Sequence, residues 1–457
     1  MSDKIIEGVH QTSEVEGYTK PMEQDVVANL EKFQDLKLGF MTHFGMFSQM
    51  SIMESWPVVD DKMDGRWSQK DVDWFDDENI KEFKKQYWNL NKSFNPIRFE
   101  PERYATTVAS LGFKYTIIPT KHHDGFCMWD TKETDYKVTN SDCPFHVNKN
   151  ADIYGTLIKE FEKQGLMCGA YFSKPDWHSN YYWSDEFRYG TNAIRNVSYD
   201  IRNEPERWEK FKEYTELQMQ EVISKYAKVD ILWLDGGQVA ISNNQDIEMD
   251  KIAANLRKTN PGLIIVDRAT GTKNENYLTP EGKVFEKYVP APWESCIPVG
   301  KSFSFRYDDE WKSPFELARL FVDIICKGGN LALNIPTQPD GRLPKAAIEN
   351  VSIFTDWVKE HEYAIFGSQP IAPYTCENAG VVKAKNGKKY MFHPGFDTIN
   401  TGKFEYITLP IAFKWIKYKG EECNIEILGE HFVKLTLPAR FHDQKTPLYF
   451  VFEYEDE

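Results

Sequence analysis

The sequence predicts an α/β fold, a (β/α)8-like barrel followed by an all-β sandwich domain. From about residue 36 to 360, short apolar runs alternate with longer amphipathic segments, which is typical of a parallel sheet covered by helices. After residue 365 the helical patterns stop, and short strand-like runs separated by Gly, Asn, Asp and Pro remain. We therefore expect an N-terminal extension (1–35), a barrel (36–364) and a sandwich (365–457).

Six runs in the barrel segment are nearly continuously apolar, as strands buried on both faces should be. They are Leu38–His43, Tyr115–Pro119, Cys168–Phe172, Asp230–Leu234, Leu263–Val266 and Asn330–Ile335. We expect two further strands in less regular segments. A closed eightfold barrel of the TIM type is favoured over a doubly wound open sheet, because the chain lacks the G-x-G-x-x-G turn that would support the open sheet.

Amphipathic segments between these runs predict helices over Asp152–Gln164, Glu204–Tyr226, Ile247–Lys258 and Ser313–Lys327. Ser313 and Glu316 form a capping-box pattern at the start of the last helix, and Gly165 suits the C-cap of the first. In the sandwich, strands are expected in Gly380–Phe392, Tyr406–Tyr418, Cys423–Ile427, Phe432–Leu437 and Tyr449–Tyr454.

Composition excludes several classes of partner. The formal net charge is −15 and the chain has no long basic run, so neither a nucleic acid nor an anionic membrane surface is expected as a partner. It has no stretch of about 18 apolar residues to span a membrane and no apolar leader segment. We therefore expect a cytoplasmic protein or a mature periplasmic or secreted form. The seven scattered cysteines predict free thiols.

Polar side chains follow five of the predicted strands at the point where each strand ends. Because the carboxyl ends of barrel strands meet at one face, which carries the active site in barrel enzymes, these side chains predict a functional site. They include His43, His122, His123, Asp176, Asp235 and Arg268.

Two chemistries could use such a set. A metal-dependent hydrolase would use His and Asp ligands, but His122 and His123 are adjacent and would point to opposite faces of a strand, so no metal is predicted. Glycoside hydrolysis needs two carboxylates, and Asp235 ends an apolar strand before two glycines that leave room for a substrate. Asp235 is therefore the natural nucleophile, and an Asp that only caps the next helix is the alternative. A sugar-binding barrel without catalysis remains a third reading of the chain.

Over about residues 36–368 the chain resembles the family of retaining α-L-fucosidases. The similar segments, in the family's order, are Leu38–Gly45, Lys121–Asp130, Trp233–Gly236, Trp293–Cys296, Lys327–Asn334 and Pro339–Gly341. The resemblance implies an exo-acting hydrolase that releases terminal α-L-fucosyl residues from oligosaccharides or glycoconjugates by double displacement. It implies no cofactor, and the sequence leaves homo-oligomerisation open.

The resemblance also implies roles for particular residues. Asp235 would be the nucleophile. The residues that would surround the sugar are His43, Glu54, His122, His123, Tyr171, Trp233 and Arg268. Trp56 would wall the pocket, although ordinary core packing explains it equally well.

The general acid/base varies in sequence position within this family. Glu294, in Trp293–Cys296, is the first choice, and Glu275 and Glu281 are the alternatives. The chain departs from the family pattern at Phe44, at Ser55 and over Phe303–Arg306. These departures leave the linkage and the leaving group open, and they also admit an L-galacto-configured relative of fucose.

Overall fold

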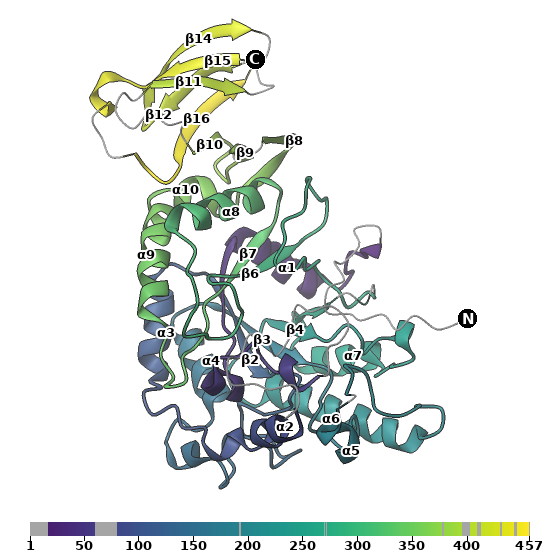
Figure 1. Cartoon of the computed structure of the whole chain (residues 1–457). Coiled ribbons are helices and arrows are strands. Elements are labelled where there is room, and N and C mark those ends of the chain that lie inside the picture. Colours follow the sequence, from purple (N-terminus) through teal and green to yellow (C-terminus); the bar gives the residue numbers. More distant parts are fainter. Residues whose placement is uncertain are drawn as a thin grey trace.

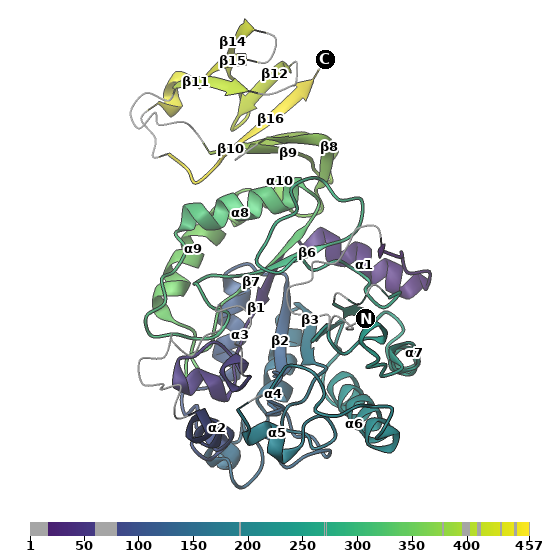
Figure 2. The same ribbon diagram turned by 45° about the vertical axis from the view of Figure 1, so that its right-hand side comes forward.

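The computed structural model describes residues 17–59, 80–191, 193–268, 270, 272–376, 379–394, 403–408, 413–429, 432–442 and 446–456. A barrel-like α/β body carries a separate all-β unit at one end (Figures 1 and 2). The helices are α1 (Gln24–Leu36), α2 (Ile80–Trp88), α3 (Pro101–Ser110), α4 (Ile153–Lys163), α5 (Asp185–Tyr189), α6 (Pro205–Ser224), α7 (Met249–Thr259), α8 (Pro314–Cys326), α9 (Lys345–Glu360) and α10 (Glu362–Ile365).

Seven strands form one curled sheet in the order β5-β4-β3-β2-β1-β7-β6, and every neighbouring pair is parallel. These strands are β1 (Leu38–Met41), β2 (Tyr115–Lys121), β3 (Met167–Ser173), β4 (Ile231–Asp235), β5 (Ile264–Asp267), β6 (Glu294–Pro298) and β7 (Asn330–Asn334). The predicted barrel class is confirmed, and β6 lies outside the six runs that were predicted to be strands.

The eighth strand of the expected barrel is replaced by an irregular segment, Asn274–Gly282, which crosses the gap between β5 and β6. The Asn276 N–H donates to the Ile265 carbonyl at 2.9 Å, and the Gly282 N–H donates to the Cys296 carbonyl at 3.0 Å. The segment contains Asn274, Asn276, Pro280 and Gly282, residue types that weaken a regular ladder. We call Asn274–Gly282 the closing segment.

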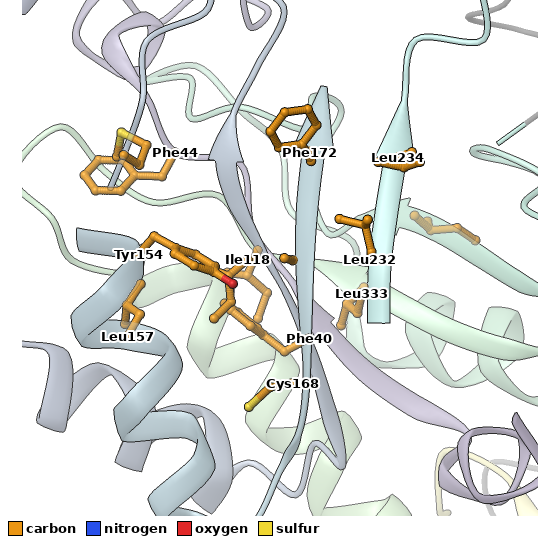
Figure 3. Packing of buried hydrophobic residues seen from close by; sticks show 14 of the residues in the cluster. Phe40, Phe44, Ile118, Tyr154, Leu157, Cys168, Phe172, Leu232, Leu234 and Leu333 are labelled. Carbon is orange, nitrogen blue, oxygen red and sulfur yellow. The ribbon is translucent and has the colours of Figure 1, made fainter. Parts of the chain in front are cut away.

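Alternate residues of the barrel strands face opposite sides, as the two-residue period of a strand requires. One set packs against the surrounding helices, and Figure 3 shows Phe40 and Ile118 beside Tyr154 and Leu157 of α4. The other set fills the barrel interior, and it includes Met41, Tyr115, Ile117, Tyr171, Ile231, Trp233, Val266 and Cys296.

Helix α1 lies across the amino-terminal ends of the strands. Its Phe33 stacks on Tyr277 at 4.5 Å between ring centroids and contacts Tyr115, the first residue of β2, at 5.1 Å. The Phe33 carbonyl accepts a 2.7 Å hydrogen bond from Asn330, the first residue of β7. Residues that the sequence analysis assigned to an extension therefore close the bottom of the barrel, and the opposite end stays available for a site.

Gly39→Ala is expected to destabilise the fold by about 1–3 kcal/mol, the usual result of overpacking a core. A Cβ on Gly39 would lie 2.1 Å from Cζ of the buried Tyr115 ring. Urea unfolding measures the effect. Gly17→Ala is the matched control, because its added carbon meets nothing within 4 Å. Equal stability of the two variants would contradict the tight packing of Tyr115 over β1.

The all-β unit contains two antiparallel sheets, with strand orders β13-β12-β16-β10-β9-β8 and β11-β15-β14. Its strands are β8 (Gln369–Cys376), β9 (Ala379–Lys383), β10 (Lys389–His393), β11 (Lys403–Thr408), β12 (Phe413–Tyr418), β13 (Glu421–Glu422), β14 (Asn424–Gly429), β15 (Phe432–Thr436) and β16 (Phe450–Asp456). The predicted sandwich is confirmed. It is fixed to the barrel through α9, where the Trp357 indole donates to the Tyr449 carbonyl at 2.9 Å.

Among the described residues, no helix has the length and apolar character needed to span a bilayer. The six cysteines whose side chains are described are buried free thiols, and the side chain of Cys376 lies outside the described part. The capping box predicted at Ser313 and Glu316 is present at the start of α8.

Candidate active site

A pocket lies at the carboxyl ends of the barrel strands. Strand parity explains why its residues meet: His43, Tyr171, Trp233 and Asp235 occupy inward positions on or just beyond β1, β3 and β4. The pocket is lined by Met41, His43, Glu54, Trp56, His122, Tyr171, Trp233, Asp235, Arg268, Glu281, Cys296 and Phe303.

Asp235, the last residue of β4, is held by three donors. Its Oδ1 accepts hydrogen bonds from the Arg268 guanidinium at 2.9 Å and from the Gly236 N–H at 2.8 Å, and its Oδ2 accepts one from the Tyr171 hydroxyl at 2.7 Å. Burial alone would raise the pKa of Asp235, but Arg268, His123 and Tyr171 bring that pKa below its ordinary value. The side chain is therefore an oriented carboxylate at neutral pH.

The same guanidinium holds a second carboxylate. Arg268 Nη1 donates to Asp235, and Nη2 donates to Glu281 of the closing segment. Burial raises the pKa of Glu281; Arg268 opposes the rise and Asp235 adds to it. The environments of the two carboxylates thus push their pKa values in opposite directions, which is the pattern of an acid and a nucleophile that share one site.

The three histidines of the site are buried and neutral. Burial lowers the pKa of His43 and of His123 to about 4 and lowers that of His122 well below its usual value. His43 Nδ1 lies 2.8 Å from Asn334 Oδ1, while the Asn334 amide donates to the Phe303 carbonyl. Asn334 Oδ1 is therefore the acceptor, so His43 carries its proton on Nδ1 and leaves Nε2 to accept from a hydroxyl.

The expectation that His122 and His123 point to opposite faces is wrong. Strand β2 ends at Lys121, and the chain then turns toward Gly125, whose φ is +76°. Both rings consequently lie side by side, with centroids 4.3 Å apart; His122 lines the pocket, while His123 is fully buried and is not among the lining residues. Ser55 Oγ lies 2.5 Å from His122 Nδ1, and Ser173 Oγ contacts His123 Nδ1.

These two histidines and Asp235 form the one group of potential metal ligands found among the described residues, with ligand atoms within 4.8 Å of one another. A cation bound to Asp235 would have to lie against the Arg268 guanidinium, which already occupies Oδ1. The donor set therefore suits an oriented carboxylate better than a metal centre.

Glu54 lines the pocket in an unusual conformation, with φ at +37°. Its backbone N–H donates to Ser304 Oγ at 3.2 Å, and its buried Oε1 has no hydrogen-bond partner among the described residues. Burial raises the pKa of Glu54 to about 8, against the opposing hydrogen bonds of Ser304. Glu54 is therefore a neutral carboxylic acid at pH 7, able to donate as well as accept.

Aromatic rings form the remaining walls. Tyr171 stacks on Trp233 with centroids 5.4 Å apart. Trp56 packs edge-on against His123 at 4.8 Å and against Trp177 at 5.6 Å, and the Arg195 guanidinium lies 4.6 Å from its ring centroid. Trp56 thus belongs both to the pocket wall and to the core behind it.

The structure does not bring Glu294 into this pocket. Glu294 is the first residue of β6, near the amino-terminal end of the barrel, and its carboxylate accepts from Tyr115, Trp233 and Tyr277 inside the barrel. Glu275, paired with Val266 of β5, is likewise absent from the described pocket lining. Among the three glutamates considered, Glu281 is the one that lines the pocket.

Three residues that line the pocket, Met41, Cys296 and Phe303, were not predicted from the sequence. Met41 lies two residues before His43 on β1, so strand alternation could have indicated it. Cys296 and Phe303 lie in and after β6, which was not recognised as a strand. Asp176, which was predicted to belong to the site, is not among the residues that line the pocket; it forms a buried ion pair with Lys121 at 2.8 Å, and a second buried ion pair joins Lys174 and Asp267.

The fold and site together define a glycoside hydrolase, because two carboxylates with opposed pKa shifts face a pocket of hydroxyl-binding and aromatic groups at the active end of a barrel. The family model for α-L-fucosidases matches residues 5–362. The chain belongs to the α-L-fucosidase family.

Two relatives illustrate the similarity in sequence. A putative α-L-fucosidase from Caenorhabditis elegans is 27% identical over 404 residues, covering 84% of this chain and 76% of the relative. An α-L-fucosidase from Dictyostelium discoideum is 23% identical over 428 residues, covering 89% and 85%.

Solved structures share the fold at lower identity. α-L-Fucosidase isoenzyme 1 from Paenibacillus thiaminolyticus has a TM-score of 0.73 and 21% identity, with 95% of this chain and 100% of that chain covered. A Bacteroides thetaiotaomicron α-L-fucosidase, solved as a trapped covalent intermediate with 2-fluoro-fucosyl fluoride, has a TM-score of 0.71 and 20% identity, covering 96% and 98%.

Proposed function

We propose that the protein is an exo-acting retaining α-L-fucosidase in which Asp235 is the nucleophile and Glu281 is the general acid/base. The observation that carries this proposal is the contact of both carboxylates with the single guanidinium of Arg268. Retaining glycosidases place their two carboxyl groups about 5–5.5 Å apart, and binding to one guanidinium keeps these two close.

In the first step, an Asp235 oxygen attacks the anomeric carbon while protonated Glu281 donates its proton to the leaving oxygen. A covalent fucosyl ester forms and the aglycone departs as an alcohol. Tyr171 and Arg268 orient the attacking carboxylate through the hydrogen bonds that they donate to it. The pKa of Glu281, raised by burial, keeps the proton available for the leaving group.

In the second step, the Glu281 carboxylate takes a proton from water, and the water oxygen attacks the anomeric carbon from the side that the aglycone left. The ester bond to Asp235 breaks, and fucose leaves with its original anomeric configuration. Neutral His43 and His122, together with Glu54, supply hydrogen bonds to ring hydroxyls, and Trp233 and Tyr171 supply apolar surface for the sugar.

Stereochemistry provides the direct test. Proton NMR of early turnover of p-nitrophenyl α-L-fucoside, with and without EDTA, is expected to show α-L-fucose first and equal rates in both samples. First appearance of the β anomer would refute the double displacement. Loss of turnover with EDTA would favour a metal hydrolase, and binding of fucose without any turnover of fucosides would favour a sugar-binding barrel.

Fucose binding is expected to weaken above about pH 8, where Glu54 ionises. A neutral acid can donate to a hydroxyl and a carboxylate cannot, so the inhibition constant of L-fucose should rise roughly tenfold per pH unit beyond that point if binding needs the donor. Glu54→Gln keeps a neutral donor at every pH, so its inhibition constant should stay flat. Parallel curves for both proteins from pH 6.5 to 9.5 would contradict this role.

The same ionisation acts on stability. The pKa of Glu54 is higher in the folded protein, about 8, than its ordinary value of 4.5. Its contribution to stability is therefore complete below pH 4.5 and is lost as the pH rises through about 8. The free energy of unfolding of Glu54→Gln, measured in urea, should lack this decline. It should therefore rise relative to that of the wild type between pH 4.5 and about 8.

A further inference from the structure

Glu294, near the amino-terminal end of the barrel, has a fully buried carboxyl group that the proposed reaction does not use. Its exposed fraction is 0%. The Tyr115 hydroxyl donates to Oε2 at 2.6 Å, while the Trp233 indole and the Tyr277 hydroxyl donate to Oε1 at 3.1 and 3.3 Å. Three donors from three different segments thus hydrogen-bond to this one side chain, so its carboxylate is held by a specific set of partners inside the barrel.

A carboxyl group in such a place is costly for the fold. Burial raises the pKa of Glu294 to about 7 against the opposing hydrogen bonds of Tyr115, Trp233 and Tyr277. An apolar side chain would fill the same space without a desolvation cost. Core packing alone therefore does not explain why a carboxyl group occupies this position. Its hydrogen-bond partners indicate another role.

The Trp233 side chain connects Glu294 to the pocket. Trp233 lines the pocket with its ring, and its indole N–H points away to Glu294. Tyr171 stacks on this ring at 5.4 Å, and the Arg268 guanidinium lies 5.3 Å from the ring centroid. Tyr171 and Arg268 are the two side chains that hold Asp235. Rotation of the indole would disturb both.

We propose that Glu294 is a positioning residue that fixes the Trp233 indole, and through it Tyr171 and Arg268, in the geometry that orients the Asp235 carboxylate. Only the kinetic consequence of this proposal rests on the proposed function. The hydrogen bond between Glu294 and Trp233 can be measured without any turnover.

The contact itself is tested by indole N–H resonances of the 15N-labelled protein. Trp233→Phe identifies the Trp233 signal by its loss. Glu294→Leu, which removes the acceptor, should shift that signal, and Glu294→Gln, which keeps an acceptor oxygen, should shift it less. An unmoved signal in Glu294→Leu would overturn the proposal whether or not the protein hydrolyses fucosides.

The consequence for the site is tested by a kinetic cycle with Glu294→Leu, Trp233→Phe and the double variant. Glu294→Leu should lower kcat/KM by about 10–100-fold on its own and by less than about threefold in the Trp233→Phe background, because the two residues act as a unit. Glu294→Gln should recover most of the loss. If Glu294→Leu does not fold, the kcat/KM of Glu294→Gln is compared with that of Trp233→Phe instead.

Tyr277→Phe is the matched control, because it removes another hydrogen bond to the same oxygen without touching Trp233. Its kcat/KM should stay within about threefold of the wild type. A loss in Glu294→Leu that is additive with Trp233→Phe would overturn the positioning role. A loss confined to substrates with poor leaving groups and reversed by azide would instead make Glu294 the acid/base, and it would overturn the assignment of Glu281 as well.

Discussion

Asp235→Ala is expected to lower kcat for p-nitrophenyl α-L-fucoside by about 10⁴–10⁶-fold, the scale seen when a nucleophile is removed from a preorganised site. The loss should be chemical and not structural, because the pocket keeps its histidines, its aromatic walls and Arg268. Added azide should restore turnover by taking the space of the missing carboxylate. Its product should be a fucosyl azide of inverted anomeric configuration, since a single displacement has replaced two.

Asp135→Ala is the matched control, since Asp135 is exposed and is not among the residues that line the pocket. It should keep wild-type turnover. A loss below 100-fold in Asp235→Ala, or a rescued azide with retained configuration, would remove Asp235 from the role of nucleophile.

Glu281→Ala is expected to lower kcat/KM by an amount that depends on the leaving group of the substrate. A poor leaving group needs a proton, so kcat/KM for a fucosyl disaccharide should fall by about 10²–10⁴-fold, the usual contribution of general acid catalysis. A 2,4-dinitrophenyl fucoside needs little protonation and should retain most of its kcat/KM. Azide should accelerate turnover of this activated substrate and should give the azide of retained configuration, because it intercepts the ester on Asp235.

The control for this variant is Glu286→Ala, an exposed carboxylate five residues further along the same connection. It should not distinguish the two substrates. A uniform loss across leaving groups in Glu281→Ala would show that Glu281 binds the substrate or holds Arg268 without transferring a proton.

Much of the architecture was predictable from strand periodicity. Six barrel strands and the β-sandwich could be predicted because buried parallel strands are nearly continuously apolar and because helical patterns end near residue 365. The parity of those strands also explains why His43, just beyond β1, and Asp235, at the end of β4, face the same pocket.

The features that were not predictable depend on contacts between distant segments. Helix α1 gives no sign in the sequence that Leu30 and Phe33 enter the barrel interior. The convergence of His122 and His123 depends on where β2 stops, which periodicity locates only to within a few residues. Glu281 and Glu294 are both glutamates near β6, and only the pairing of the closing segment with β6 sets Glu281 opposite Cys296, two residues further along than Glu294.

The closing segment has a consequence for how such enzymes change over time. A residue inserted into a paired strand turns every later side chain to the opposite face. The closing segment is joined to β5 and β6 by only a few hydrogen bonds, so it can gain or lose residues without altering the seven paired strands. Insertions or deletions in the closing segment can therefore move the proposed proton donor, Glu281, along the chain while the proposed nucleophile, Asp235, stays at the end of β4. Such changes would alter leaving-group preference and leave the sugar pocket as it is.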